Sequence, residues 1–427
     1  MPEPAASHAR LAFQYPNFRL YQVARFLIVC AAEMQSVAVG WQIFAITHRP
    51  LDLGLAGLAQ FLPGIVLFLV GGHTADRLNR RSILLVCFSA FGLCSLALLL
   101  FTMHGLKSVH PIYAVLVLTG IVRAFNAPAA QAFLPQLVPE EVFPTAVAWG
   151  SSVFMTATIA GPAVGGLLYG FTRTPLAVYF CALAFFLVAV LLVMNIRMKE
   201  ARRVMRKFDV QTVLAGFRYI GEHKVILGAI TLDLFAVMLG GAVALLPVYA
   251  RDILQAGPIG LGILRSAPGV GASIMAIVLA YRPMRRRAGA TMLWCVAGFG
   301  VFTIVFGLSR TILLSVAALA LVGATDMVSV IVRSTLIQLN TPDQMRGRVS
   351  AVNMLFIGTS NEFGQFESGI TAQWFGTVPA VVLGGVGTLV VVALSAWLFP
   401  ELRRVQELKV VPKDIPDESH VTADPGE

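Results

Sequence analysis

Long apolar runs dominate this sequence and constrain its fold more than any other feature. A bilayer core is about 30 Å thick, and a helix needs about 20 mostly apolar residues to cross it. Twelve such runs lie near residues 19–43, 52–73, 82–103, 111–134, 143–168, 176–196, 225–249, 259–281, 290–308, 311–338, 349–375 and 378–399. The pattern predicts an all-α membrane protein with twelve transmembrane helices.

The composition agrees with a membrane solvent. Of the 427 residues 57% are hydrophobic and 13% are charged, whereas soluble domains have about 45–50% and about 25%. The net charge of +10 would suit a nucleic-acid binder, but it also suits a membrane protein with basic cytoplasmic loops. With the N-terminus inside, the outer loops hold few of the 32 Lys and Arg residues: Arg49, Lys107, Arg173, Arg251 and Arg310. We therefore expect cytoplasmic termini, a lipid bilayer around the spans and no nucleic-acid partner.

The two halves of the chain resemble each other. LAGLAQFLPG at 55–64 matches LGILRSAPG at 261–269, and a nearly equal offset pairs Gly120 with Gly323. Two six-helix copies joined by a polar linker suggest bundles that rock about a central site. The predicted parts are an N-terminal bundle at 1–196, a cytoplasmic linker at 197–223, a C-terminal bundle at 224–400 and a mobile cytoplasmic tail at 401–427.

A charged loop, GGHTADRLNRRS, follows the second run. Its pattern is carried by Gly72, Asp76, Arg77, Arg80 and Arg81. It resembles the G-x-x-x-D-R-x-x-R-[RK] loop of the major facilitator superfamily, although Asn79 stands where that family often has Gly. The resemblance implies the twelve-helix fold of that superfamily.

Gly72 and Asp76 lie one helical turn apart and share a face. A small residue at Gly72 would let another helix approach closely. The Asp76 carboxylate would then stabilise a helix N-terminus, which the resemblance places near Arg348. We expect a latch that holds the inner side closed. Arg80 and Arg81 also fit a plainer role as topology determinants.

The fifth run contains AGPAVGGLLYG, in which Gly161, Pro162, Gly165 and Gly166 resemble the G-P-x-x-G-G motif of exporters in this superfamily. Proline bends a helix, and glycines permit close helix packing. The motif favours export, although small residues also pack helices in proteins that export nothing.

Three further stretches narrow the resemblance: PNFRLYQVARFL, RAFNAPAAQAFLPQLVPEE and TPDQMRGRVSAVNMLF. They resemble the branch with enterobactin-type siderophore exporters and multidrug or macrolide efflux proteins. The resemblance covers residues 15–400. It implies a secondary exporter in the cytoplasmic (inner) membrane of a bacterium.

Ionisable residues inside membrane spans are costly and are functional candidates by default. As proton-coupling or substrate-binding candidates we take Asp326 and Glu362 first, then Glu33, Asp233, Glu367, Arg123 and Arg265. Arg123 and Asp326 are repeat equivalents, so they would pair across a central cavity, bind opposite ends of a substrate or form a fixed ion pair. Gln60 and Arg265 are also equivalents and would line the outer mouth. Arg333 would snorkel to the inner surface.

The leading hypothesis is proton-driven export of a small amphipathic molecule by a monomer. An uptake symporter or uniporter for a nutrient and a non-transporting sensor are the alternatives. The chain contains no HExxH sequence and no P-loop, so neither an enzyme nor an ATP-driven pump is expected. We expect no cofactor and no metal site. The substrate, the coupling ion and the proton-carrying acid stay open.

Overall fold

The computed structural model describes residues 11–197, 210–282 and 287–405. In these ranges the chain is almost entirely helical and carries no strand. The helices that match the first six predicted spans are α2 (Pro16–Thr47), α3 (Pro50–Arg77), α4 (Arg80–Met103), α5 (His110–Phe133), α6 (Phe143–Thr172) and α7 (Leu176–Met194). The later ones are α9 (Lys224–Gly240), α11 (Gly257–Tyr281), α12 (Ala288–Leu308), α13 (Ile312–Asn340), α14 (Asp343–Phe375) and α15 (Thr377–Leu398).

Shorter elements complete the described chain. Helix α8 (Val210–Glu222) precedes α9, and α16 (Pro400–Arg404) follows α15. The 3-10 turns are η1 (Ala12–Gln14), η2 (Leu134–Gln136) and η3 (Glu140–Val142). Much of the predicted linker and tail lies outside the described residues, so their cytoplasmic position stays a prediction.

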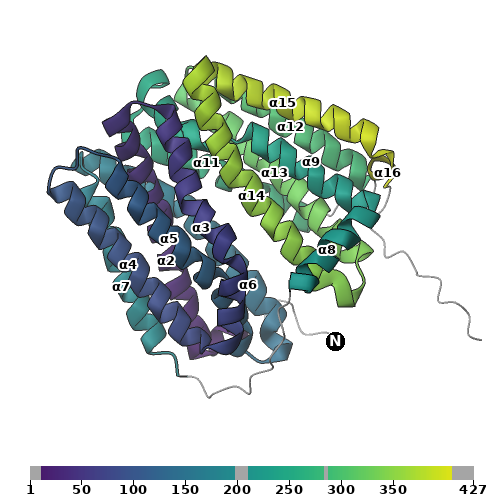
Figure 1. Ribbon diagram of the computed structural model, residues 1–427, viewed down its shortest axis with the longest axis horizontal. Coiled ribbons are helices and arrows are strands. Elements are labelled where there is room, and N and C mark those ends of the chain that lie inside the picture. Colours follow the sequence, from purple (N-terminus) through teal and green to yellow (C-terminus); the bar gives the residue numbers. More distant parts are fainter. Residues whose placement is uncertain (1–10, 198–209, 283–286, 406–427) are drawn as a thin grey trace, which may run out of the picture.

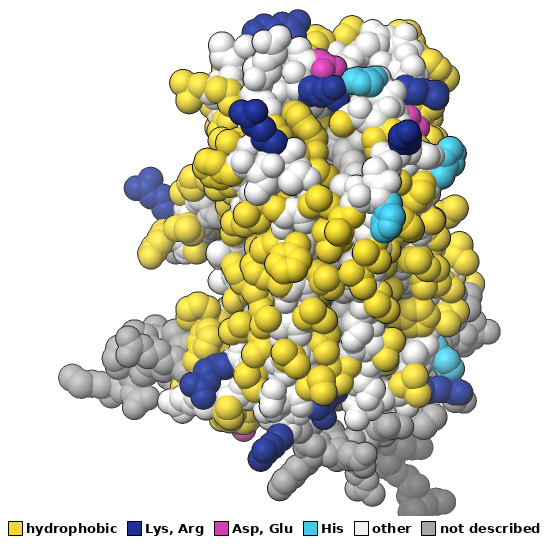
Figure 2. All heavy atoms as spheres, turned by 90° about the vertical axis from the view of Figure 1, so that its left-hand side faces the viewer, with side chains coloured by type: hydrophobic (Ala, Val, Ile, Leu, Met, Phe, Trp, Pro, Cys, Tyr) yellow, Lys and Arg dark blue, Asp and Glu magenta, His cyan; other side chains and the backbone are white. Residues whose placement is uncertain are grey.

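The surface fits a membrane. Figure 2 shows a broad belt of hydrophobic side chains between two ends where Lys, Arg and His gather. In the described part of the chain, eleven helical segments are long and apolar enough to cross a bilayer. Helix α14 is not among them, because polar residues such as Asn361, Glu362 and Gln365 interrupt it. Its length of 33 residues still suffices to span.

The seventh predicted span, 225–249, is not one helix. Helix α9 ends at Gly240, and a 3-10 turn η4 (Ala242–Leu245), a short α10 (Leu246–Val248) and a π-helical turn η5 (Tyr249–Ile253) follow. A side chain replaces part of the lost helical bonding, since the Ser368 hydroxyl donates to the Gly241 carbonyl at 2.9 Å. Irregular backbone inside a membrane is tolerated where protein surrounds it or a cavity adjoins it.

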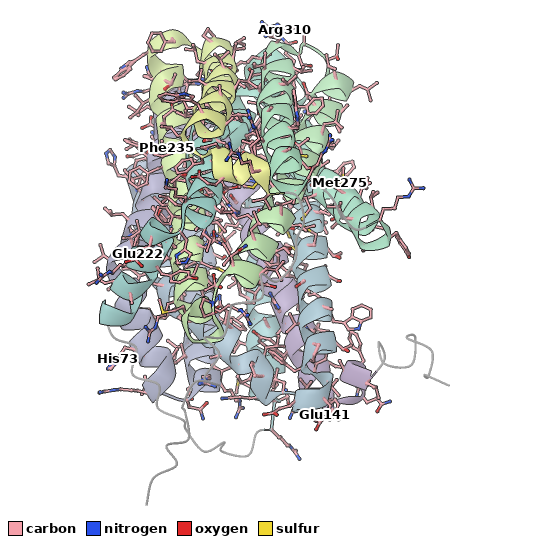
Figure 3. The ribbon with its side chains drawn as sticks, turned by 90° about the vertical axis from the view of Figure 1, so that its right-hand side faces the viewer. His73, Glu141, Glu222, Phe235, Met275 and Arg310 are labelled. Atoms are coloured by element: carbon pink, nitrogen blue, oxygen red, sulfur yellow. The ribbon has the colours of Figure 1, made fainter. Side chains whose placement is uncertain are left out.

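Helices α2–α7 form one bundle and α9–α15 form the other, and Figure 1 shows the two side by side. We call one end of the molecule the Arg310 end and the opposite one the His73 end, after residues labelled in Figure 3. The bundles contact each other mainly through α3 with α14 and α6 with α11. Helix α8 packs on α14 towards the His73 end.

Glycines make the contact between bundles close. A Cβ added to Gly166 on α6 would lie 2.7 Å from Gly262 Cα on α11. A Cβ on Gly54 of α3 would lie 3.0 Å from the Gln365 carbonyl oxygen of α14. A Cβ at Gly166 would clash and one at Gly54 would be very tight, so the helices touch backbone to backbone in the parts nearer the Arg310 end.

Candidate functional site

A cavity of about 390 Å³ lies mainly within the N-terminal bundle where it borders the C-terminal bundle, and we call it the central cavity. Most of its wall comes from α2, α3 and α5, and the C-terminal bundle adds residues of α10, α11 and α14. Its charged and amide-bearing lining residues include Glu33, Gln60, Arg123, Arg265 and Gln365. Charged side chains in membrane spans are functional candidates, so this cavity is the candidate binding site.

A second cavity of about 470 Å³ extends from the central cavity towards the His73 end, and we call it the vestibule. Helices α3, α5 and α14 form its walls. Gln60 and Arg123 line both cavities and stand where they join. Most of the remaining wall is apolar, with Phe61 and Met354 among its side chains, while Glu362 adds one carboxylate.

Glu362 is held by a neighbour on its own helix. The Gln365 amide donates to the Glu362 carboxylate at 3.1 Å. The same carboxylate lies close to Gly57 on α3, since a Cβ there would approach it to 3.4 Å. The predicted candidate Glu362 therefore lies at the boundary between the bundles. Glu367 accepts a hydrogen bond from Thr371 at 2.7 Å and lines neither cavity.

A third cavity of about 190 Å³ lies inside the C-terminal bundle, and we call it the C-terminal cavity. Asp233, Asp326 and Arg333 line it among mainly apolar side chains. Arg333 and Asp233 form a salt bridge there and are 3% and 5% exposed. The prediction that Arg333 snorkels to the surface is wrong, because a buried carboxylate on α9 neutralises it where it stands.

The pairing expected for the repeat equivalents does not occur in this arrangement. Arg123 lines the central cavity and the vestibule, whereas Asp326 lines the C-terminal cavity. Among the ion pairs of described residues none joins these two side chains. Gln60 and Arg265, the other equivalents, do share one cavity.

The charged loop after α3 holds the N-terminal bundle together. Arg80 donates to the Ala132 carbonyl at 2.9 Å, near the end of α5. Arg81 donates to the Val193 and Met194 carbonyls at the end of α7, at 3.1 and 2.6 Å. Free carbonyls at a helix C-terminus attract cations, so both arginines have a structural role beyond topology.

The latch predicted at this loop is not engaged at Gly72. A Cβ there would meet no atom within 4 Å, and the residue lines the vestibule. The close helix approach expected at Gly72 is therefore absent in this conformation. Arg77 ends α3, and the side chain of Asp76 lies outside the described part, so its contact near Arg348 stays a prediction.

The glycines of the fifth-span motif pack against two different helices, α2 and α11. A Cβ on Gly161 or Gly165 would strike α2, at 2.6 Å from Glu33 Cβ and 2.8 Å from Met34 Cα. Gly166 instead meets α11, and the Pro162 carbonyl oxygen lies 2.6 Å from a Cβ added to Gly262. One face of α6 thus packs inside its own bundle and the adjacent face closes on the other bundle.

Sequence reasoning missed two features of the site. Gln365 was not proposed, although its spacing of three from Glu362 puts both on one helix face. Ser36 was not proposed either, and no local pattern marks it. It accepts a hydrogen bond from Arg265 at 2.6 Å, a contact between α2 and α11 that only tertiary packing creates. Among the described residues no group of three His, Cys, Asp or Glu could hold a metal ion.

Comparison with known proteins identifies the family of this chain. A family model described as transmembrane secretion effector matches residues 7–424. Enterobactin exporters from Shigella boydii serotype 18 and Citrobacter koseri are each 27% identical. The alignments span 393 and 403 residues, which is 92% and 94% of this chain and 94% and 96% of those proteins.

Solved structures show the same fold at low sequence identity. The nucleoside transporter NupG is 15% identical with a TM-score of 0.68, over 91% of this chain and 99% of its own. A bacterial homologue of the lysosomal transporter Spinster is 14% identical with a TM-score of 0.67, over 91% and 97%. With its family model matched over nearly the whole length, the chain belongs to the transmembrane secretion effector family, a branch of the major facilitator superfamily of membrane transporters.

Proposed function

We propose that this transporter exports a small amphipathic molecule, a siderophore, drug or metabolite, by alternating access and at the expense of a proton gradient. One observation carries the proposal: a central cavity whose wall includes charged and amide side chains joins a mainly apolar vestibule, and Gln60 and Arg123 line both. A molecule with a polar group and an apolar body would find a matching wall for each. The enterobactin exporters named above, each 27% identical to this chain, support a cargo of this kind.

We place the protein in the bacterial cytoplasmic membrane with its His73 end in the cytoplasm. The loop that carries Arg80 and Arg81 lies at that end, as the bias of positive charge towards the cytoplasm requires. The bundles close on each other near the Arg310 end, while the vestibule lies towards the His73 end. A substrate would enter from the cytoplasm, and opening of the Arg310 end would release it outside.

Asp326 is the first candidate for the proton carrier. Arg333 is the one guanidinium among the described lining residues of the C-terminal cavity, and it is paired with Asp233. Among the ion pairs of described residues none includes Asp326. An intramembrane carboxylate without a fixed partner is a natural proton relay. Glu362 is the second candidate, since it stands between the bundles, and Glu33 in the central cavity is the third.

Transport into inside-out membrane vesicles tests the function. We expect vesicles that contain the protein and are acidified inside to accumulate enterobactin, and collapse of the proton gradient to abolish the accumulation. Asp326→Asn should reduce the gradient-driven rate at least about tenfold, the loss typical of removing a proton-transfer group. Glu222→Gln, on the exposed end of α8, is the matched control and should keep the wild-type rate.

Two outcomes contradict the proposal. Accumulation that persists without a gradient would indicate facilitated diffusion and would remove the coupling. Gradient-driven accumulation only in right-side-out vesicles would indicate uptake. A panel of lipophilic dyes and macrolides measured in the same vesicles separates a siderophore exporter from a multidrug exporter.

A further inference from the structure

The Arg265 side chain reaches across the boundary between the bundles. It stands on α11 in the C-terminal bundle, and its guanidinium donates to the Ser36 hydroxyl of α2 at 2.6 Å. The contact lies in the wall of the central cavity, since both residues line it. A guanidinium carries five N–H donors in a planar fork, and this single hydrogen bond to a neutral hydroxyl occupies one of them.

No carboxylate among the described residues lies within ion-pair distance of Arg265, although Glu362 on α14 interacts with it electrostatically. Glu33 is the one carboxylate among the described lining residues of the central cavity, and it lies on α2 one turn before Ser36. Yet among the ion pairs of described residues none includes Arg265 or Glu33. Among its described lining residues the cavity holds two guanidinium groups and one carboxylate, and the Glu362 carboxylate of the adjoining vestibule interacts electrostatically with both guanidinium groups. Arg333 in the C-terminal cavity shows the contrast, because its charge is matched by a buried Asp.

An arginine held inside a membrane is costly unless something compensates its charge. A planar, bidentate oxygen anion fits a guanidinium fork better than any other common group. We propose that Arg265 is an anion-binding subsite of the transporter, which takes a carboxylate or phenolate group of the substrate. The inference rests on the proposed transport function and adds the charge of the cargo to it.

The position of Arg265 gives the subsite a second consequence. Its bond to Ser36 helps to hold α11 on α2, next to the close approach of Gly262 and Gly166. A substrate anion that binds the guanidinium competes with the neutral Ser36 oxygen and replaces it, because charge-assisted hydrogen bonds are about twice as strong as neutral ones. Binding of the anion would therefore release one of the contacts that close the Arg310 end.

Another cross-bundle contact remains when this one is released. Arg251 on η5 donates to the Phe44 carbonyl at 3.4 Å, and its guanidinium lies 5.6 Å from the centre of the Phe44 ring. Substrate binding at Arg265 would thus weaken the contact between the bundles at the Arg310 end and favour opening. The Arg251 contact would still hold the bundles together in part. A ligand shifts such an equilibrium only by its difference in affinity for the two states.

The test uses a pair of ligands that differ in charge but hardly in shape, salicylate and salicylamide. Full-length protein in lipid nanodiscs should bind radiolabelled salicylate at least about tenfold more tightly than salicylamide, as expected for a charged hydrogen-bond pair. Arg265→Gln, which installs the residue found at the equivalent position Gln60, should erase that preference. Arg265→Lys keeps the positive charge and should keep part of the preference for salicylate. Ser36→Ala should retain the full preference.

Opening gives a second measurement. Spin labels placed at Arg173 on the N-terminal bundle and at Arg310 on the C-terminal bundle report the separation of the bundles at the Arg310 end. Salicylate should shift this distance to larger values in the wild type, and salicylamide should not. Ser36→Ala should shift it without any ligand, whereas Arg265→Gln should give no response to salicylate.

Equal binding of the two ligands by the wild type, or a preference for salicylate that survives in Arg265→Gln, would overturn the proposal. An unchanged melting temperature of Arg265→Gln would show that this variant is folded. If Arg265→Gln is unfolded, the salicylate preference of Arg265→Lys is measured instead, and a preference as large as that of the wild type would contradict the proposal. If gradient-driven transport in vesicles fails but the preference for salicylate persists, the proposed function is contradicted and the anion subsite is not. A protein that exports normally but binds both ligands alike would refute the anion subsite alone.

Discussion

Charged residues inside the membrane-spanning helices of this transporter are of two kinds. Asp233 and Arg333 neutralise each other inside the C-terminal bundle, where almost no solvent reaches them. Arg123 and Arg265 instead line cavities between the bundles, and no ion pair among the described residues includes them. A fixed ion pair stabilises one structure, whereas an unpaired charge at a cavity wall can bind and release a ligand.

The ion pair supports a prediction about stability. Arg333→Leu leaves the Asp233 carboxylate buried without its partner, which costs about 3–5 kcal/mol. The melting temperature in detergent should fall clearly. Combining Arg333→Leu with Asp233→Leu removes both charges and should restore most of the loss. A double variant no more stable than Arg333→Leu alone would show that the pair is not the source of the stability.

At the scale of the helix, small residues decide which neighbours α6 can approach. Gly165 faces α2 in the same bundle, and the next residue, Gly166, faces α11 in the other. The first contact belongs to the permanent core of the N-terminal bundle. The second would have to break if the Arg310 end opened as proposed, so the two adjacent glycines would stabilise different contacts.

Leucine substitutions should distinguish the contact of α6 with α2 from the contact of α6 with α11. Gly165→Leu forces a side chain against Met34 inside a bundle, and such overpacking typically costs about 1–3 kcal/mol. It should lower the melting temperature. Gly166→Leu wedges the bundles apart, so it should increase the separation of labels at Arg173 and Arg310 with a smaller effect on melting. Val164→Leu, at an exposed position of α6, is the control and should change neither. Identical behaviour of both glycine variants would contradict the division.

At the scale of the whole molecule, the arrangement of two bundles gives the chain a closed end and an end with a vestibule. The bundles meet through α3 with α14 and α6 with α11. Figure 1 shows them converging at one end and separating towards the end where α8 lies. The orientation of this assembly in the membrane determines which side the vestibule serves.

Cysteine labelling tests that orientation. In a variant without native cysteines, a membrane-impermeant maleimide added to intact cells should modify a cysteine at Lys107 or Arg173 and should leave one at Arg203 unmodified. The reason is the scarcity of Lys and Arg in the loops predicted outside. Permeabilised cells control for reactivity at Arg203. The reverse labelling pattern would place the His73 end outside and make the vestibule an external entrance.

The sequence by itself determined the class, the number of spans and most helix positions. The predicted run 311–338 corresponds to α13 (Ile312–Asn340), and 176–196 corresponds to α7 (Leu176–Met194). The physical reason is local: a bilayer requires each crossing segment to be apolar and helical on its own. The superfamily could also be predicted, since its loop motif needs only short-range spacing.

Tertiary structure alone decided the partners of the charged residues. Asp233 and Arg333 are 100 residues apart in sequence and meet because α9 packs beside α13. Arg265 and Ser36 are 229 apart and meet because the bundles touch. The helix break after Gly240 could not be predicted from the sequence either, since an apolar run has the same composition whether its helix is continuous or interrupted. Hydrophobicity is a property of each segment, but an ion pair or a cavity wall depends on which segments become neighbours.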